Sequence, residues 1–115
     1  FETIKYIIKF VIKINKLMAI KKQYLKSKPV CKVTFEVLAK DSKTVSVVGD
    51  FNKWNSETTP LKKLKNGKFK GVISLDADNI YEFKYVVDGN YQNEEKADAF
   101  KWNDYANSEN SVLEL

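Results

Sequence analysis

The stretch at residues 80–87 reads IYEFKYVV and decides the fold. Alternate positions carry two different sets of side chains: Tyr81, Phe83, Tyr85 and Val87 in one set, and Glu82, Lys84 and Val86 in the other. Successive side chains of a β-strand point to opposite faces, so this pattern predicts a strand whose aromatic face packs against a core. Asp88-Gly89 follows directly and predicts a tight hairpin turn onto Tyr91-Gln92.

Similar short strand patterns lie on both sides of this stretch. They occupy residues 31–37, 44–48, 61–64, 68–75 and 111–115. Turn signals separate them, including Asp41-Ser42 and the hairpin signal Asn66-Gly67, for which we expect a type I′ turn. About seven short strands at roughly ten-residue spacing predict an all-β, antiparallel β-sandwich. The polar stretches at 49–55 and 93–110 are predicted to be loops.

The chain has 115 residues, which is enough for one domain. Its formal charge of +5 is unevenly distributed, because residues 1–30 carry +7 and residues 31–115 carry −2. Nucleic-acid binders place positive charge on the folded surface that meets phosphate, and they favour Arg for bidentate contacts. The predicted sandwich is slightly acidic and the chain has no Arg, so we expect no nucleic-acid partner.

Two features of the composition argue against catalysis. The chain has no His, which removes Ser-His-Asp and Cys-His nucleophiles as well as His-ligated metals. Its single cysteine, Cys31, allows neither an intrachain disulfide nor a cysteine cluster for zinc, and its place in an alternating apolar run predicts burial. We therefore expect no catalytic residues, no metal site and no cofactor.

Residues 1–29 are predicted to be a basic amino-terminal extension, and residues 30–115 the sandwich domain. Lysines interrupt every apolar run of residues 1–17, so we expect neither a secretory signal nor an integral membrane segment. Two interpretations of residues 1–17 stay open. They could form a short basic amphipathic helix or a disordered extension, or they could be upstream-translated or added sequence with Met18 as the natural start. The lack of a signal and of disulfides favours the cytoplasm.

Several aromatic side chains fall where a core does not need them. Trp54 lies in the polar loop GDFNKWN, Tyr91 follows a glycine turn, and Trp102 and Tyr105 lie in the polar run before the last strand. Exposed aromatic rings often mark a binding surface, and a flat ring suits the apolar C–H face of a sugar whose hydroxyls bond to Asn, Lys or Ser. The alternative is that these rings fold back over the ends of the sandwich.

Three motifs occur in a fixed order: GDFNKWN at 49–55, YEFKYVVDGNY at 81–91 and ENSVLEL at 109–115. Together they resemble the glycogen-binding domain of the AMP-activated protein kinase β subunit. More widely, they are similar to family 48 of the carbohydrate-binding modules and to isoamylase amino-terminal domains. The resemblance covers residues 30–115 and implies an immunoglobulin-like sandwich of the early set that binds glucan.

The resemblance also implies which residues contact the sugar. Trp54 matches the tryptophan that stacks on glucose, and Lys84 matches the lysine that donates to sugar hydroxyls. Tyr91 stands where the family has a second tryptophan. Its ring is smaller, which predicts weaker binding or an altered preference.

Near the carboxyl end, the resemblance assigns Ser108 and Asn110 to the positions of a threonine and an asparagine in the sugar site. Ala106 stands where the family has a leucine that reaches over the bound chain. Either Trp102 or Tyr105 could replace that leucine, and both possibilities stay open.

The leading hypothesis is non-catalytic binding of α-1,4-glucan, as glycogen, starch or maltooligosaccharide. The alternative is an interaction or structural module that docks in trans on a glucan-processing enzyme, or self-associates, without binding sugar. A carboxylate-based glycosidase is the third possibility. We expect Asp50 and Asp88 to form turns rather than a catalytic pair.

Overall fold

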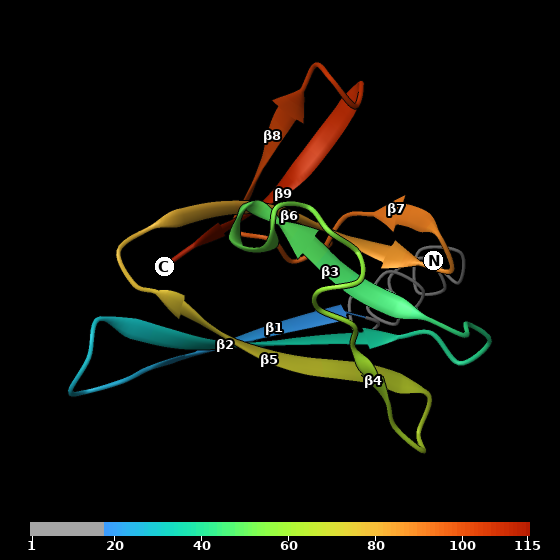
Figure 1. Cartoon of the computed structure of the whole chain (residues 1–115), viewed down its shortest axis with the longest axis horizontal. Coiled ribbons are helices and arrows are strands. Elements are labelled where there is room, and N and C mark those ends of the chain that lie inside the picture. The colour runs from blue at the N-terminus through green and yellow to red at the C-terminus, as the bar shows by residue number, and fades with distance from the viewer. Residues whose placement is uncertain (1–17) are drawn as a thin grey trace, which may run out of the picture.

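The computed structural model describes residues 18–115, which form a sandwich of two antiparallel sheets (Figure 1). The interpretations of residues 1–17, among them the amphipathic helix, lie outside the described residues. The part of the chain that is described contains no helix long and apolar enough to cross a membrane.

Nine strands make up the two sheets of residues 18–115. The first sheet has the order β1-β2-β5-β4, with β1 at Met18–Tyr24, β2 at Val30–Leu38, β5 at Lys68–Asp76 and β4 at Lys62–Lys63. The second sheet has the order β3-β6-β9-β8, with β3 at Val45–Gly49, β6 at Ile80–Val87, β9 at Ser108–Glu114 and β8 at Ala99–Asn103. Strand β7 at Asn90–Gln92 also pairs with β6, and a 3-10 turn, η1, spans Asp50–Asn52. The predicted all-β antiparallel sandwich is confirmed.

The core lies between the inner faces of the sheets and is rich in aromatic rings. Phe35 on β2 meets Phe83 and Tyr85 on β6 with ring centroids 5.4 and 6.1 Å apart, both in edge-to-face geometry. All three rings are fully buried. Burying a side chain of this size contributes about 1.5–3 kcal/mol, so contacts across the two sheets stabilise the sandwich.

Strand β6 confirms the alternation expected for residues 80–87. Phe83, Tyr85 and Val87 are buried in the core. The intervening Glu82 and Lys84 therefore lie on the outer face of the second sheet. That outer face carries the candidate site.

Strand β1 differs from the expected organisation, because residues 18–24 fall within the predicted extension at 1–29. In the structure they pair with β2 along its length, from Met18 opposite Val37 to Tyr24 opposite Cys31. Met18 and Ile20 are half-buried and pack against the core. The sandwich therefore begins before residue 30 within the described chain.

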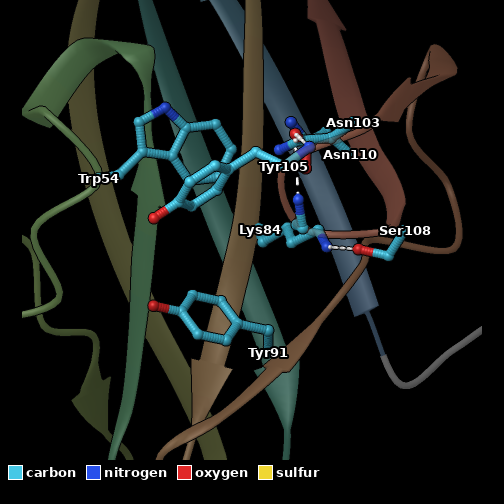
Figure 2. Close-up of a pocket in the computed structure, with 8 residues that line it drawn as sticks. Trp54, Lys84, Tyr91, Asn103, Tyr105, Ser108 and Asn110 are labelled. Atoms are coloured by element: carbon cyan, nitrogen blue, oxygen red, sulfur yellow. Dashed lines mark hydrogen bonds between the residues drawn. The ribbon is translucent and has the colours of Figure 1, made fainter.

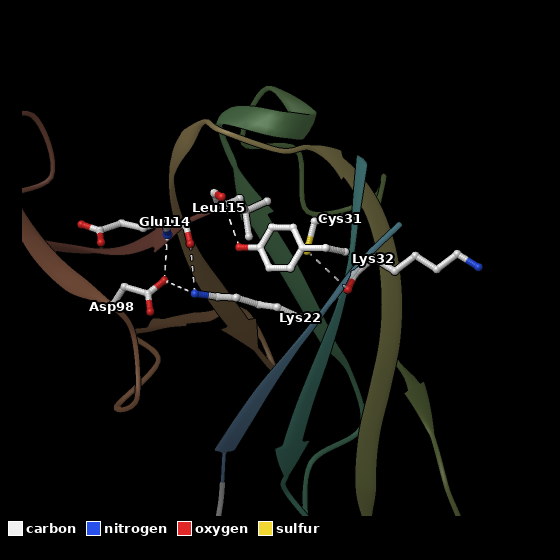
Figure 3. Close-up of polar contacts among 7 residues, drawn as sticks. Lys22, Cys31, Lys32, Asp98, Glu114 and Leu115 are labelled. Atoms are coloured by element: carbon white, nitrogen blue, oxygen red, sulfur yellow. Dashed lines mark hydrogen bonds and ion pairs between the residues drawn. The ribbon is translucent and has the colours of Figure 1, made fainter. Parts of the chain in front are cut away.

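Lys22 explains why this strand was not predicted. It stands opposite the buried Val33, at an inward position where the alternation calls for an apolar side chain. Its Nζ instead donates to Oδ2 of Asp98 at 2.7 Å and to the carbonyl of Glu114 at 3.0 Å (Figure 3). The next inward residue, Tyr24, donates its hydroxyl to the carbonyl of Leu115 at 3.2 Å. These bonds join the edge of the first sheet to the end of β9.

The two predicted hairpin turns have different outcomes. Asp88 and Gly89 both have positive φ, 48° and 86°, as a two-residue type I′ turn requires, and they join β6 to β7. At Asn66-Gly67 only Gly67 has positive φ, at 85°, so the expected type I′ turn is wrong. The amide of Gly67 bonds to the carbonyl of Leu64, which places Asn66 inside a turn that Gly67 closes.

Candidate functional site

A hollow of about 560 Å³ lies on the outer face of the second sheet (Figure 2). Its lining consists of Trp54, Lys84, Tyr91, Asn103, Tyr105, Ala106, Ser108 and Asn110. All five residues that were predicted to bind sugar are among them. The volume is within the range of about 300–1,000 Å³ typical of small-molecule sites.

Trp54 lies in a loop that follows β3 and has a strained backbone. Lys53 and Trp54 both adopt left-handed conformations, with φ of 56° and 57°, which bulky residues seldom do. The amide of Trp54 returns to the carbonyl of Gly49 at 3.0 Å. Gly49 is required here, because a Cβ would lie 2.5 Å from the carbonyl oxygen of Glu82. The loop thus turns sharply and presents the indole beside β6.

Asp50 fixes the indole of Trp54 in this position. Its Oδ1 accepts a hydrogen bond from Trp54 Nε1 at 3.2 Å, and its Oδ2 accepts one from the amide of Glu82 at 2.8 Å. The prediction that Asp50 lies in a turn is consistent with its place in η1. Its second role, to connect the loop to β6 and to orient the ring, could not be predicted from the sequence.

Lys84 supplies hydrogen-bond donors at the floor of the hollow. Its side chain is only 7% exposed, and its Nζ donates to Oγ of Ser108 on β9 at 2.6 Å. An ammonium group has three donors, so two remain that the hydroxyls of a ligand can accept. The hydroxyl of Ser108 holds the lysine in place and is itself part of the lining.

Asn110 is the most deeply buried member of the set, at 3% exposed. Its Nδ2 donates to Oε1 of Glu82 at 3.1 Å. Its Oδ1 has no hydrogen-bond partner among the described residues. Buried polar atoms are normally paired, and one left unpaired beside a hollow is a candidate for contact with a ligand or with water.

Aromatic rings line the hollow opposite these polar groups. Figure 2 shows the rings of Trp54, Tyr105 and Tyr91 on one side, and Lys84 and Ser108 on the other. Tyr91 stands on β7 and is 63% exposed, and Tyr105 in the β8–β9 turn is fully exposed. Trp54 is half-buried but does not belong to the core, so none of the three rings serves as a core side chain.

Tyr105 is the aromatic residue that lies beside Ala106, where the smaller side chain leaves room. Both residues line the hollow, whereas Trp102 does not. That one of these two rings replaces a bulky residue at position 106 stays a prediction, and the lining is consistent with Tyr105 rather than Trp102. Asn103 is a polar residue of the lining that was not predicted. It would have been found if 99–103 had been recognised as a strand paired with β9.

Two carboxylates near the site have shifted pKa values. Glu94 is fully buried, and this burial raises its pKa, although it accepts hydrogen bonds from the hydroxyl of Tyr85 and the amide of Lys96. Asp88, in the exposed turn after β6, accepts the amides of Thr44 and Lys43, and these two bonds lower its pKa. Neither carboxylate lines the hollow.

Residues 23–101 match the family model described as Carbohydrate-binding module 48 (Isoamylase N-terminal domain), so the match covers 79 of the 115 residues. The matched range contains Trp54, Lys84 and Tyr91 and ends before Ser108 and Asn110. A comparison with curated proteins found no match.

Proposed function

The chain belongs to the carbohydrate-binding module 48 family, and on that premise we propose that it binds α-1,4-linked glucan without making or breaking a bond in it. The ligand class comprises glycogen, starch and maltooligosaccharides. The observation that carries the proposal is the convergence of Trp54, Lys84 and Tyr91 on one hollow. Trp54 comes from the loop after β3, whereas Lys84 and Tyr91 come from the β6–β7 hairpin later in the sequence.

The proposed mechanism is stacking combined with hydrogen bonding. The rings of Trp54 and Tyr91 cover the apolar C–H faces of glucose residues, and Lys84 donates to their hydroxyls. Ser108 and Asn110 complete the polar side of the site. Each stacked ring contributes on the order of 1 kcal/mol, so we expect dissociation constants between about 1 μM and 1 mM.

The arrangement of the rings favours an α-glucan. A β-linked chain is flat and suits a planar row of aromatic rings. Here Trp54, Tyr91 and Tyr105 come from three separate segments and line a hollow rather than one flat strand, which suits the curved path of an α-linked chain. Asp50, one of the two aspartates considered for a catalytic pair, uses both oxygens to hold the loop and β6, which supports a non-catalytic role.

Binding of this modest strength is useful when it brings another protein domain to the glucan. We therefore propose that the module localises a glucan-processing enzyme, either fused to it or docked in trans, where avidity compensates for the modest affinity of one site. The cytoplasm remains the proposed compartment and is consistent with a single cysteine that is buried in the core.

Titration with maltoheptaose, followed by tryptophan fluorescence and amide chemical shifts, tests the proposal. We expect saturable binding in the range above, and at least a tenfold loss in Trp54→Ala. Cello-oligosaccharides of the same length serve as the control and should bind much more weakly. No response at millimolar maltoheptaose, or an unchanged response in Trp54→Ala, would contradict glucan binding and leave the interaction module as the better description.

A further inference from the structure

A second hollow of about 410 Å³ adjoins the first one. Trp54, Asn103, Tyr105 and Asn110 line both hollows, so the two share a wall. The second hollow continues past this wall toward β8, over Asp50, Glu82, Lys101, Trp102 and Asp104. The residues that line only the first hollow, among them Lys84 and Tyr91, are absent from the second.

Tyr105 marks the boundary between the two hollows. Its side chain is fully exposed and contributes nothing to the core. Its backbone is nevertheless held, because Oδ1 of Asn103 accepts hydrogen bonds from the amide of Tyr105 at 3.0 Å and from the amide of Ala106 at 3.3 Å. A ring presented on an anchored turn at the junction of two hollows is placed to contact a ligand that extends across both.

Hydrogen-bond acceptors dominate the second hollow. Its lining contains three carboxylates, those of Asp50, Glu82 and Asp104, and one ammonium group, that of Lys101. The Lys101 Nζ lies 3.7 Å from Glu82 Oε2. The unpartnered Oδ1 of Asn110 belongs to the wall that both hollows share. Such a surface suits the hydroxyls of uncharged sugars and disfavours phosphate-bearing ones.

We propose that the second hollow is a further subsite that binds additional uncharged glucose residues of the same α-glucan chain beyond Tyr105. The inference rests on the proposed function, because it assumes that glucan occupies the first hollow. It predicts that the module binds a longer segment of glucan than the first hollow can hold.

Calorimetric titration of the full chain with maltotriose and with maltoheptaose tests this subsite. The variant is the double substitution Lys101→Ala with Asp104→Ala, which changes two exposed residues found only in the second hollow. We expect it to bind maltotriose as the wild type does, but to lose about three- to tenfold in affinity for maltoheptaose, the effect of one or two hydrogen bonds. The matched control is Tyr91→Ala in the first hollow, which should lower the affinities for both ligands by the same factor.

A second measurement does not depend on the stability of any variant. In the wild-type protein, maltoheptaose should shift the backbone amides of Lys101 and Asp104, whereas maltotriose should leave them nearly unchanged. The subsite is overturned if both ligands shift these amides equally, or if the double variant keeps the wild-type ratio of affinities. If neither ligand binds, glucan binding itself fails and the subsite fails with it. If Tyr91→Ala binds both ligands as the wild type does, glucan does not occupy the first hollow, and the subsite, which assumes that it does, is overturned.

Discussion

The indole nitrogen of Trp54 donates to the carboxylate of Asp50 at 3.2 Å, and this bond orients the largest ring of the site. The second oxygen of Asp50 accepts the amide of Glu82 on β6 at 2.8 Å. The ring is thereby fixed to the sheet on which Lys84 lies, although its own loop has a strained backbone. In the proposed site, Asp50 is therefore a positioning residue for the ring of Trp54.

Substituting Asp50 should weaken both glucan binding and the fold. In Asp50→Ala the indole loses its partner and the amide of Glu82 loses its acceptor, so we expect a three- to tenfold loss of maltoheptaose affinity and about 1–3 kcal/mol of destabilisation. The specific signature is a change in tryptophan emission without ligand, because the ring becomes mobile. Asp50→Asn retains a single acceptor and should give an intermediate affinity. Wild-type binding by Asp50→Ala would show that the ring needs no such support.

Tyr91 should limit the affinity of the site, because its ring is the smaller of the two proposed platforms. Tyr91→Trp enlarges the stacking surface and should tighten maltoheptaose binding by about two- to fivefold, while Tyr91→Ala should weaken it by about three- to tenfold. Tyr91 is 63% exposed, so neither change should move the midpoint of thermal unfolding much. Phe100→Ala is the matched control, since Phe100 is exposed to a similar degree and lines neither hollow.

The parts of the molecule that were predictable are those whose structure is indicated by the pattern of residues adjacent in sequence. The alternation in 80–87 marks the inward side of β6 because each side chain reports its own face. The positions of Trp54, Lys84 and Tyr91 were identified because their motifs resemble a known family. Their convergence on one hollow is a property of the structure.

The parts that escaped prediction depend on contacts between distant residues. Lys22 faces inward because Asp98, 76 residues away, accepts a hydrogen bond from its ammonium group. This partner cannot be recognised from the residues around Lys22, so the sequence of β1 predicts a basic extension. The bond from Asp50 to the amide of Glu82 spans 32 residues. The left-handed conformation of Trp54 is likewise imposed by its surroundings, since no local preference of tryptophan favours it.

Asp88 should stabilise the fold at neutral pH, and this contribution should be lost in acid. Its pKa is lowered because it accepts the amides of Thr44 and Lys43 in its ionised form. A group with a lowered pKa in the folded state stabilises the fold above its unfolded pKa, and this contribution is lost as the pH falls through the folded value. Urea unfolding between about pH 2 and pH 6 should therefore show a smaller loss of stability in Asp88→Asn than in the wild type. The carboxylate is exposed, so the difference should be small, and parallel curves for the two proteins would contradict the assignment.

Glu94 should have the opposite effect on stability. Burial raises its pKa, so the folded protein binds a proton that the unfolded chain releases between the unfolded value of 4.5 and the higher folded value. Across that interval, stability falls as the pH rises, because the carboxylate must ionise inside the core. Burial also raises the pKa of Tyr85, whose phenol therefore stays protonated and donates to Glu94 at 2.8 Å.

Glu94→Gln removes the ionisation while its amide oxygen can still accept the hydrogen bond from Tyr85. The amide of Lys96 loses its acceptor, but this cost does not depend on pH. We expect the stability of the variant, measured by urea unfolding, to change less than that of the wild type between about pH 4.5 and pH 7. Glu94→Ala leaves the buried hydroxyl of Tyr85 without its acceptor and should cost about 1–3 kcal/mol at every pH. Maltoheptaose affinity should be unchanged in Glu94→Gln, since Glu94 lines neither hollow and Tyr85 faces the core. The same slope of stability against pH in Glu94→Gln and the wild type would mean that Glu94 does not ionise at a raised pKa in the folded protein.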